Sequence, residues 1–269
     1  MKYGRRHRVT AVAVLTGIAT AVLIVFIGLP LLAIFLQVPF GTLLAALHSP
    51  VALDALRVSL KTSLIALAFI IVVGTPVAHL LGTRDFPGRT VVVTFLELPL
   101  VLPPVVAGIA LFAAFGRTGL LGEHLTRFGI RIPFTWVAVV MAQAFVAMPF
   151  YVRQAIAAFG SVDPQLLSAS RTLGAGPGRT FLRVAVPLSR QSLSAGAALA
   201  WARALGEFGA TALFAGSLQG VTQTLPLAIY GQFSAIDFNG ALAMSALLVA
   251  VSFGILITVK LLLRFGEWA

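Results

Sequence analysis

The sequence predicts an all-α integral membrane protein with six transmembrane helices and cytoplasmic N- and C-termini. Of the 269 residues, 59% are hydrophobic and only 10% are charged, and the mean hydropathy is +1.02. Soluble domains carry about 25% charged residues, so this chain has too little charge to cover a water-facing surface. Six apolar runs are long enough to cross about 30 Å of hydrocarbon. The basic residues lie in short clusters between these runs, as in proteins oriented by positive charge on the cytoplasmic side.

The six predicted spans follow one another along the chain. They are residues 9–36, 59–82, 90–115, 132–152, 192–214 and 241–263. The first is too long for the apolar core of a cleaved signal peptide, so we expect it to be retained. The stretch 217–236 is also apolar, but several glutamines and threonines and three helix breakers make it a poor crossing. We expect a re-entrant or interfacial segment there.

The positions of the charges favour six crossings with both termini in the cytoplasm. In that topology 13 of the 19 lysines and arginines lie on the cytoplasmic side, 5 lie outside, and Arg203 lies within the membrane. A seventh crossing would move Lys260 and Arg264 outside and weaken this bias. The net charge of +11 forms no single patch interleaved with aromatic residues, so we expect no nucleic-acid partner. The chain has no cysteine, which excludes disulfides and thiolate metal sites.

The longest predicted cytoplasmic segment, residues 153–190, carries a short amphipathic helix. Asp163 and Pro164 predict its start, because Asp caps free backbone donors and Pro suits the first helical position. The helix is predicted over residues 165–173, and Gly174 fits the left-handed position that ends it. Three side chains share its apolar face: Leu166, Ala169 and Leu173. Such a helix either lies among lipid headgroups or fits a groove on a partner.

This segment resembles the Glu-Ala-Ala loop of ABC importer permeases. The family pattern is Glu-Ala-Ala, three residues and Gly, and then an apolar-x-apolar-Pro ending. Ala169, Gly174 and Pro187 match at the expected spacing, whereas Ser168 stands in place of the Glu and Ser170 in place of the second Ala. In the family this loop is the coupling helix that seats in a cleft of the ATP-binding subunit. The resemblance assigns that role to six residues here: Ser168, Ala169, Ser170, Leu173, Gly174 and Pro187.

Four further stretches are similar to molybdate-type permeases: residues 98–108, 115–122, 202–211 and 222–230. The likeness runs over residues 59–264, within what we expect to be one transmembrane permease domain of residues 1–269 with the type I ABC importer permease fold. The motif in 202–211 is shared with sulfate permeases and indicates the wider oxyanion group. The Thr-Gln-Thr-Leu-Pro-Leu-Ala-Ile-Tyr stretch of 222–230 favours molybdate.

The resemblance implies that a homodimer of this chain forms the pathway for molybdate or tungstate in a bacterial or archaeal cell (inner) membrane. Its implied partners are two ATP-binding cassette subunits, an extracytoplasmic oxyanion-binding protein and membrane lipid. ATP and Mg²⁺ would be bound by the ATP-binding subunits, and no cofactor by this chain. One alternative is a sulfate or thiosulfate permease of the same family. Another is an autonomous channel or ion-driven carrier, which would need no docking loop.

The residues themselves carry no sign of catalysis, so we expect no enzyme activity. A phosphate-binding loop needs glycines ahead of a Lys-Ser/Thr pair, and Lys61-Thr62 lacks them. The four histidines are scattered without metal-ligand spacing, so we also expect no metal site.

Charges inside the predicted spans are costly, so they face protein or water-filled cavities. Arg203 and Glu207 are four residues apart and can pair on one helix face. Either the pair is structural and fixes helix packing, or Arg203 lies near the anion path and Glu207 holds it in position. Glu97 is a third charge inside a predicted span. Three prolines near Glu97 predict a kink or interruption of the third span: Pro99, Pro103 and Pro104. This kink would either act as a gate or be required only for helix packing.

Overall fold

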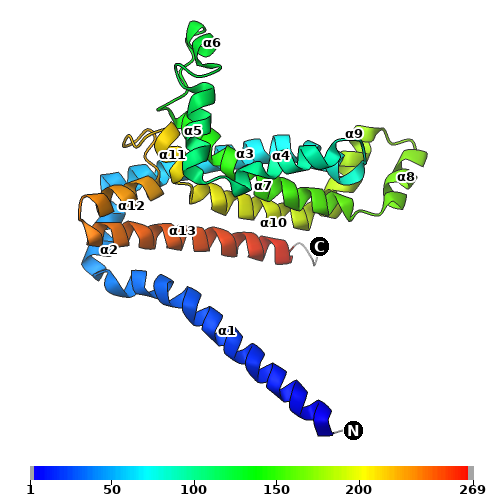
Figure 1. The fold of residues 1–269 in the computed structure, drawn as a ribbon, viewed down its shortest axis with the longest axis horizontal. Coiled ribbons are helices and arrows are strands. Elements are labelled where there is room, and N and C mark those ends of the chain that lie inside the picture. Colours follow the sequence, from blue (N-terminus) through cyan, green and yellow to red (C-terminus); the bar gives the residue numbers. More distant parts are fainter. Residues whose placement is uncertain (1–2, 266–269) are drawn as a thin grey trace.

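The computed structural model describes the backbone of residues 3–265 and the side chains of residues 13–258 and 261. Residues 1–2 and 266–269 of the predicted domain lie outside that part. Every regular element within it is helical (Figure 1). The helices are α1 Tyr3–Gln37, α2 Phe40–His48, α3 Pro50–Thr83, α4 Arg89–Val101, α5 Pro104–Phe115, α6 Gly122–Arg127, α7 Trp136–Gly160, α8 Pro164–Thr172, α9 Pro177–Thr180, α10 Val186–Leu205, α11 Gly209–Phe214, α12 Leu225–Ser234 and α13 Phe238–Phe265.

The centre of the molecule is a bundle in which α3, α7 and α10 lie side by side (Figure 1). Small residues allow these helices to approach closely. A Cβ atom added to Gly82 of α3 would lie 2.7 Å from the carbonyl oxygen of Ile156 on α7. At Gly74 the same atom would meet the ring of Tyr151 at 3.1 Å. Glycine is therefore required at Gly82, where the neighbour is backbone and cannot move aside.

Four helices are long and apolar enough to cross a membrane within the described residues, and a bent pair of helices makes up to five. The four are α1 from Ala13, α3, α7 and α13 to Thr258. The predicted fifth span corresponds to α10, which carries Arg190, Arg203 and three serines and is not among them. The total of six crossings therefore stays a prediction.

The bent pair is α4 and α5, which meet at an angle of 114°. Each residue before a proline is pushed away from helical geometry, and two such residues follow each other here. Leu102 precedes Pro103 and has φ −70° and ψ 130°, and Pro103 precedes Pro104 with φ −54° and ψ 136°. The chain is extended over both residues and the helix is interrupted. Pro99 lies inside α4 without breaking it.

Several predicted boundaries were wrong. α3 begins at Pro50 and its 34 residues are about 51 Å long, so it exceeds the thickness of a bilayer core. α7 continues to Gly160, eight residues beyond the predicted end of its span. The fifth helical segment starts at Pro177 and runs without a gap through a π-helical turn, Phe181–Ala185, into α10. It ends at Leu205 and not at residue 214.

The segment 217–236 contains a tight loop and one short helix. Gly216 and Gly220 adopt φ of +68° and +72°, a conformation that glycine takes at little cost. The ten residues of α12 span about 15 Å, half of a bilayer core. This segment does not cross a membrane as a helix, as its polar residues and helix breakers predict.

The two ends of the bundle carry different elements. The start of α1 and the last turns of α13 lie at the same end as α8 and α9, and α2 and α12 lie at the opposite end (Figure 1). α1 diverges from the bundle after its junction with α2 (Figure 1). The most apolar stretch of α1, within Ala13–Gln37, is not buried at all.

Candidate functional site

α8 has a fixed start and a fixed end. Asp163 is its N-cap, and Oδ1 of Asp163 accepts a 2.8 Å hydrogen bond from the N–H of Gln165. At the other end Gly174 has φ +84°, and the N–H groups of Gly174 and of the next residue donate to the carbonyls of Arg171 and Ser170. This pair of bonds is the Schellman motif, which satisfies carbonyls that a helix end leaves free.

The two serines that replace residues of the family pattern have local partners. Oγ of Ser170 lies 3.2 Å from Oγ1 of Thr180, which ties α8 to α9. Oγ of Ser168 donates to the carbonyl of Gln165 at 2.9 Å within α8. Leu167 packs against the bundle core. α8 is therefore held to the molecule on one side.

The predicted apolar face of α8 points away from the bundle. Leu173 is 88% exposed and Leu166 is 48% exposed. Ala169 is exposed as well, and no residue of α8 is buried. An apolar face without cover at the end of a membrane protein indicates a contact with lipid headgroups or with a partner.

Pro187 lies inside the first turn of α10 and not at the end of a loop. Proline has no N–H to donate, so the α-helical bond at this position is missing. The preceding turn widens, because the N–H of Val186 donates to the carbonyl of Phe181, five residues back. The predicted loop 153–190 is therefore helical at both ends and irregular only around α8.

The pair predicted on the fifth helix is present at its end. Nη2 of Arg203 lies 2.6 Å from Oε2 of Glu207. The side chain of Glu207 is fully buried, and that of Arg203 is 26% exposed. Oε1 of Glu207 also accepts a 2.8 Å hydrogen bond from the N–H of Ala210 in the first turn of α11. This second bond has a local signal in the sequence, since an acidic residue just before a helix start can cap it, but it was not among the predicted contacts.

One carboxylate therefore fixes the elbow between α10 and α11. Beyond the elbow, α11 packs tightly against α5 through glycines on both helices. A Cβ atom on Gly108 would lie 2.9 Å from the backbone of Ala210, and one on Gly209 would lie 2.8 Å from Pro104. The ion pair and the interrupted α4–α5 span are thus parts of one packed unit.

Glu97 has a partner in a segment that was predicted to be a loop. Oε1 of Glu97 lies 3.7 Å from Nε of Arg153, which belongs to the extended α7. The side chains are 37% and 72% exposed. Exposed pairs of this kind contribute about 0–1 kcal/mol, whereas removing one partner of a buried pair, as at the elbow, typically costs about 3–5 kcal/mol. Opposite charge is the one feature of the sequence that relates these two residues.

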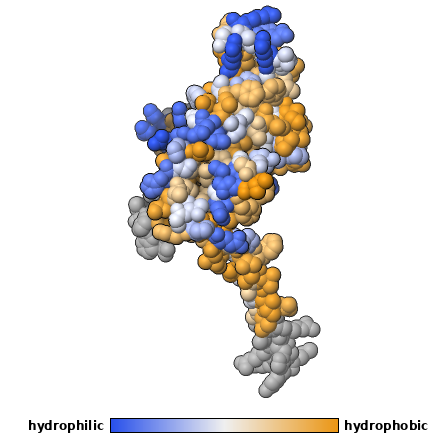
Figure 2. All heavy atoms as spheres, turned by 90° about the vertical axis from the view of Figure 1, so that its left-hand side faces the viewer, coloured by the Kyte–Doolittle hydropathy of each residue, from blue (hydrophilic) through white to orange (hydrophobic). Residues whose placement is uncertain are grey.

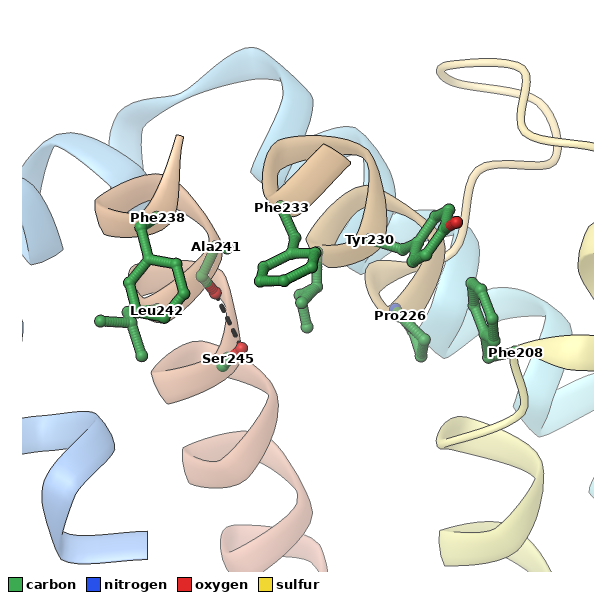
Figure 3. Close-up of a pocket in the computed structure, with 9 residues that line it drawn as sticks. Phe208, Pro226, Tyr230, Phe233, Phe238, Ala241, Leu242 and Ser245 are labelled. Atoms are coloured by element: carbon green, nitrogen blue, oxygen red, sulfur yellow. Dashed lines mark hydrogen bonds between the residues drawn. The ribbon is translucent and has the colours of Figure 1, made fainter. Parts of the chain in front are cut away.

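An aromatic cavity of about 310 Å³ lies beside the elbow, between α12 and α13 (Figure 3). The rings of Phe208 and Tyr230 are 5.0 Å apart, and those of Phe233 and Phe238 are 5.9 Å apart. Tyr230, Phe233 and Phe238 are more than half exposed. Aromatic side chains in this position, at the end of the bundle opposite α8, are typical of a membrane–water interface. Within the described residues, no three His, Asp or Glu side chains lie close enough to hold a metal ion.

These features define a class of protein: a multi-pass helical membrane protein with a broken span and an exposed helix at one end, as in transport permeases. Residues 74–265 match the model of the binding-protein-dependent transport system inner membrane component, and this chain belongs to that family. It is an inner-membrane permease subunit of an ABC importer.

Two relatives illustrate the range of the family. The chain is 45% identical over 233 residues to the molybdenum transport system permease protein ModB of Mycobacterium tuberculosis, covering 85% of this chain and 86% of the relative. It is 33% identical over 243 residues to the sulfate transport system permease protein CysT of Escherichia coli K12, covering 89% and 88%.

A solved structure shares the fold. A chain of a bacterial ABC transporter involved in the import of the acidic polysaccharide alginate superposes with a TM-score of 0.75 at 16% identity. The match covers 97% of this chain and 96% of that chain.

Proposed function

We propose that this chain forms the membrane pathway for molybdate or tungstate, as a homodimer driven by two separate ATP-binding subunits. The observation that carries the choice of anion is the 45% identity to a molybdenum permease, against 33% to a sulfate permease over a similar length. A sulfate or thiosulfate permease is the second candidate, supported by the same family membership. An extracytoplasmic oxyanion-binding protein would deliver the anion.

The proposed topology has six crossings with both termini in the cytoplasm. The position of the start of α1, the last turns of α13 and α8 at one end of the bundle supports it (Figure 1). α10 would be the sixth crossing, with its two arginines facing protein or the pathway, because a charge facing lipid costs about 2.5–3.5 kcal/mol or more. The end that carries α8 is then cytoplasmic.

The coupling role belongs to α8 and the residues around it. Its exposed face of Leu166, Ala169 and Leu173 would seat in a cleft of the ATP-binding subunit, with Gly174 setting the end of the helix. ATP and Mg²⁺ would be bound by that subunit, and no cofactor by this chain. The caps of α8 and its hydrogen bond to α9 support this role, because a helix that transmits movement from a partner subunit must stay rigid.

The pathway residues are proposed at the elbow and at the broken span. Arg203, held by the buried Glu207, would lie near the anion, since a fixed positive charge favours an oxyanion in a region of low dielectric. The second role for the pair is structural only, as the anchor of α11. The break at Pro103 and Pro104, together with Pro99 one turn earlier in α4, would act as the gate. Glu97 would hold α4 to α7 through its ion pair with Arg153.

The choice of anion is tested by competition. The chain, its ATP-binding subunit and its binding protein are reconstituted in proteoliposomes, and uptake of labelled molybdate is measured with tungstate or sulfate as competitor. We expect tungstate to abolish uptake and an equal concentration of sulfate to leave it almost unchanged. Equal competition by sulfate would move the assignment to sulfate.

A further inference from the structure

Residues 104–135 form an arm that projects sideways from the bundle. α5 packs against α11 and the first turns of α7, and beyond α5 the chain with α6 extends away from α3, α7 and α10 (Figure 1). The arm joins the ends of α4 and α7 that are remote from α8, so in the proposed topology it lies towards the outside. Its tip is hydrophilic, in contrast to the hydrophobic α1 (Figure 2).

The arm is basic. It carries Arg117, Arg127 and Arg131 against a single carboxylate, Glu123. All three arginines are exposed, and none of the ion pairs between described side chains involves them. An outward arm with uncompensated positive charge raises the local concentration of anions.

Two of these arginines line one cavity of about 220 Å³. Arg117 and Arg131 come from opposite sides of α6 in the sequence, and Thr126 of α6 lines the cavity between them. No carboxylate lines it, and Arg127 does not line it either. The lining of this cavity therefore includes two arginines that are 14 positions apart in the sequence.

Phe112 and Phe134 form an aromatic floor of the cavity. The rings of Phe112 and Phe134 are 6.3 Å apart at 71°, an edge-to-face arrangement. Phe134 has φ +61°, a backbone conformation that is unfavourable for a bulky residue and is common at functional sites. Its ring also fits against Gly216, where a Cβ atom would lie 3.0 Å from the ring.

The loops that carry the arginines are also braced by hydrogen bonds. After Arg117, the N–H groups of Leu120 and Leu121 donate to the carbonyls of Ala113 and Ala114 at 3.0 and 2.9 Å. Before Arg131, the N–H of Ile130 donates to the carbonyl of Leu125 at 2.9 Å. These bonds hold the backbone close to Arg117 and Arg131, from which both side chains extend.

We propose that this cavity binds a divalent tetrahedral oxyanion of the transported class on its way to the gate. The guanidinium group matches the geometry of two oxyanion oxygens at once. Two such groups supply two positive charges for a dianion. The site rests on the proposed function, since it takes the same anion, but it lies on the arm and is separate from Arg203.

The test is tungstate binding to the permease–ATPase complex in lipid nanodiscs, without the binding protein. Equilibrium dialysis measures bound tungsten for the wild type, Arg117→Gln with Arg131→Gln, and Arg127→Gln. We expect the double variant to bind about 10-fold more weakly or worse, since charge-assisted hydrogen bonds are lost. Arg127→Gln, on the same arm but outside the cavity, should change affinity by less than about 2-fold.

Three results would overturn the site: no saturable binding by the wild type, unchanged binding by the double variant, or an equal loss with Arg127→Gln. If the double variant binds tungstate normally but loses uptake only with the binding protein present, the arm docks that protein instead. Should the double variant fail to assemble, Arg117→Lys with Arg131→Lys replaces it. This variant keeps the positive charge but cannot bind two anion oxygens through one side chain. Weaker binding therefore supports the site, and unchanged binding refutes it.

Failure of the site differs from failure of the proposed function. If the wild type takes up no oxyanion with ATP and the binding protein, the proposed function is wrong. If it takes up molybdate while the double variant binds tungstate like the wild type, only the arm site is wrong.

Discussion

Replacing Glu207 by alanine is expected to destabilise the protein by about 3–5 kcal/mol, the typical cost of removing one partner from a buried ion pair. The change leaves Arg203 without its 2.6 Å partner and the N–H of Ala210 without its acceptor. The elbow between α10 and α11 loses both bonds that set its angle. The measurement is the thermal midpoint of the detergent-solubilised permease, together with the yield of assembled complex.

Glu97→Ala is the matched control, because it also removes a carboxylate from an ion pair. The Glu97–Arg153 pair is 3.7 Å long and partly exposed, so its loss should cost no more than about 1 kcal/mol. A Glu207→Ala variant as stable as Glu97→Ala would contradict the role of Glu207 at the elbow.

A double replacement separates the two roles of Arg203. Arg203→Met with Glu207→Gln removes both charges and keeps an oxygen that can accept from the N–H of Ala210, so neither an unpaired buried charge nor an unpaired donor is left. Restored stability with normal uptake would mean that the pair is structural only. Restored stability with uptake lost would place Arg203 in the anion path.

Replacing Leu173 by aspartate is expected to uncouple the permease from its ATP-binding subunit. Burial of a leucine side chain contributes about 1.5–3 kcal/mol, so its loss weakens the contact by roughly 10- to 100-fold. A carboxylate forced into an apolar cleft weakens it further. Because Leu173 is 88% exposed, the permease itself should keep its thermal midpoint. Retention of the ATP-binding subunit on the purified permease measures the effect.

Thr172→Asp is the control for that variant. It adds the same charge to the same helix end at an exposed position next to the apolar face. We expect this variant to retain the ATP-binding subunit. If both variants lose the subunit equally, charge at the end of α8 and not its apolar face governs the contact.

Local signals in the sequence predict the parts of the fold that local chemistry decides. Asp163-Pro164 and Gly174 delimit α8, and Pro103-Pro104 interrupts the third span, because caps and prolines act within a few residues. The start of α9 at Pro177 has a local signal of the same kind, because proline suits the first helical position. The join of α9 to α10 has no such signal. Pro187 ends the family pattern and leads into the fifth span, but the helix already begins ahead of it, because a π-helical turn before Pro187 joins α9 to α10.

Contacts between distant segments could not be predicted from patterns of this kind. Glu97 and Arg153 are 56 positions apart, and only the extension of α7 brings them together. The floor of the arm cavity depends on the backbone of Phe134 and on Gly216, 82 positions later. The pair of Arg203 and Glu207 was predictable because the two residues are four positions apart at the end of one helix. The hydrogen bond from the N–H of Ala210 in α11 to Glu207 was not predicted.

The most direct measurement is uptake of labelled molybdate by proteoliposomes that contain this chain, its ATP-binding subunit and its binding protein, with and without internal and external ATP. The ATP-binding subunit is used in its native form and in a form that binds but cannot hydrolyse ATP. We predict uptake only when the native subunit has ATP. Equal uptake without ATP, or with the inactive subunit, would contradict an ATP-driven permease and would indicate a channel or ion-driven carrier.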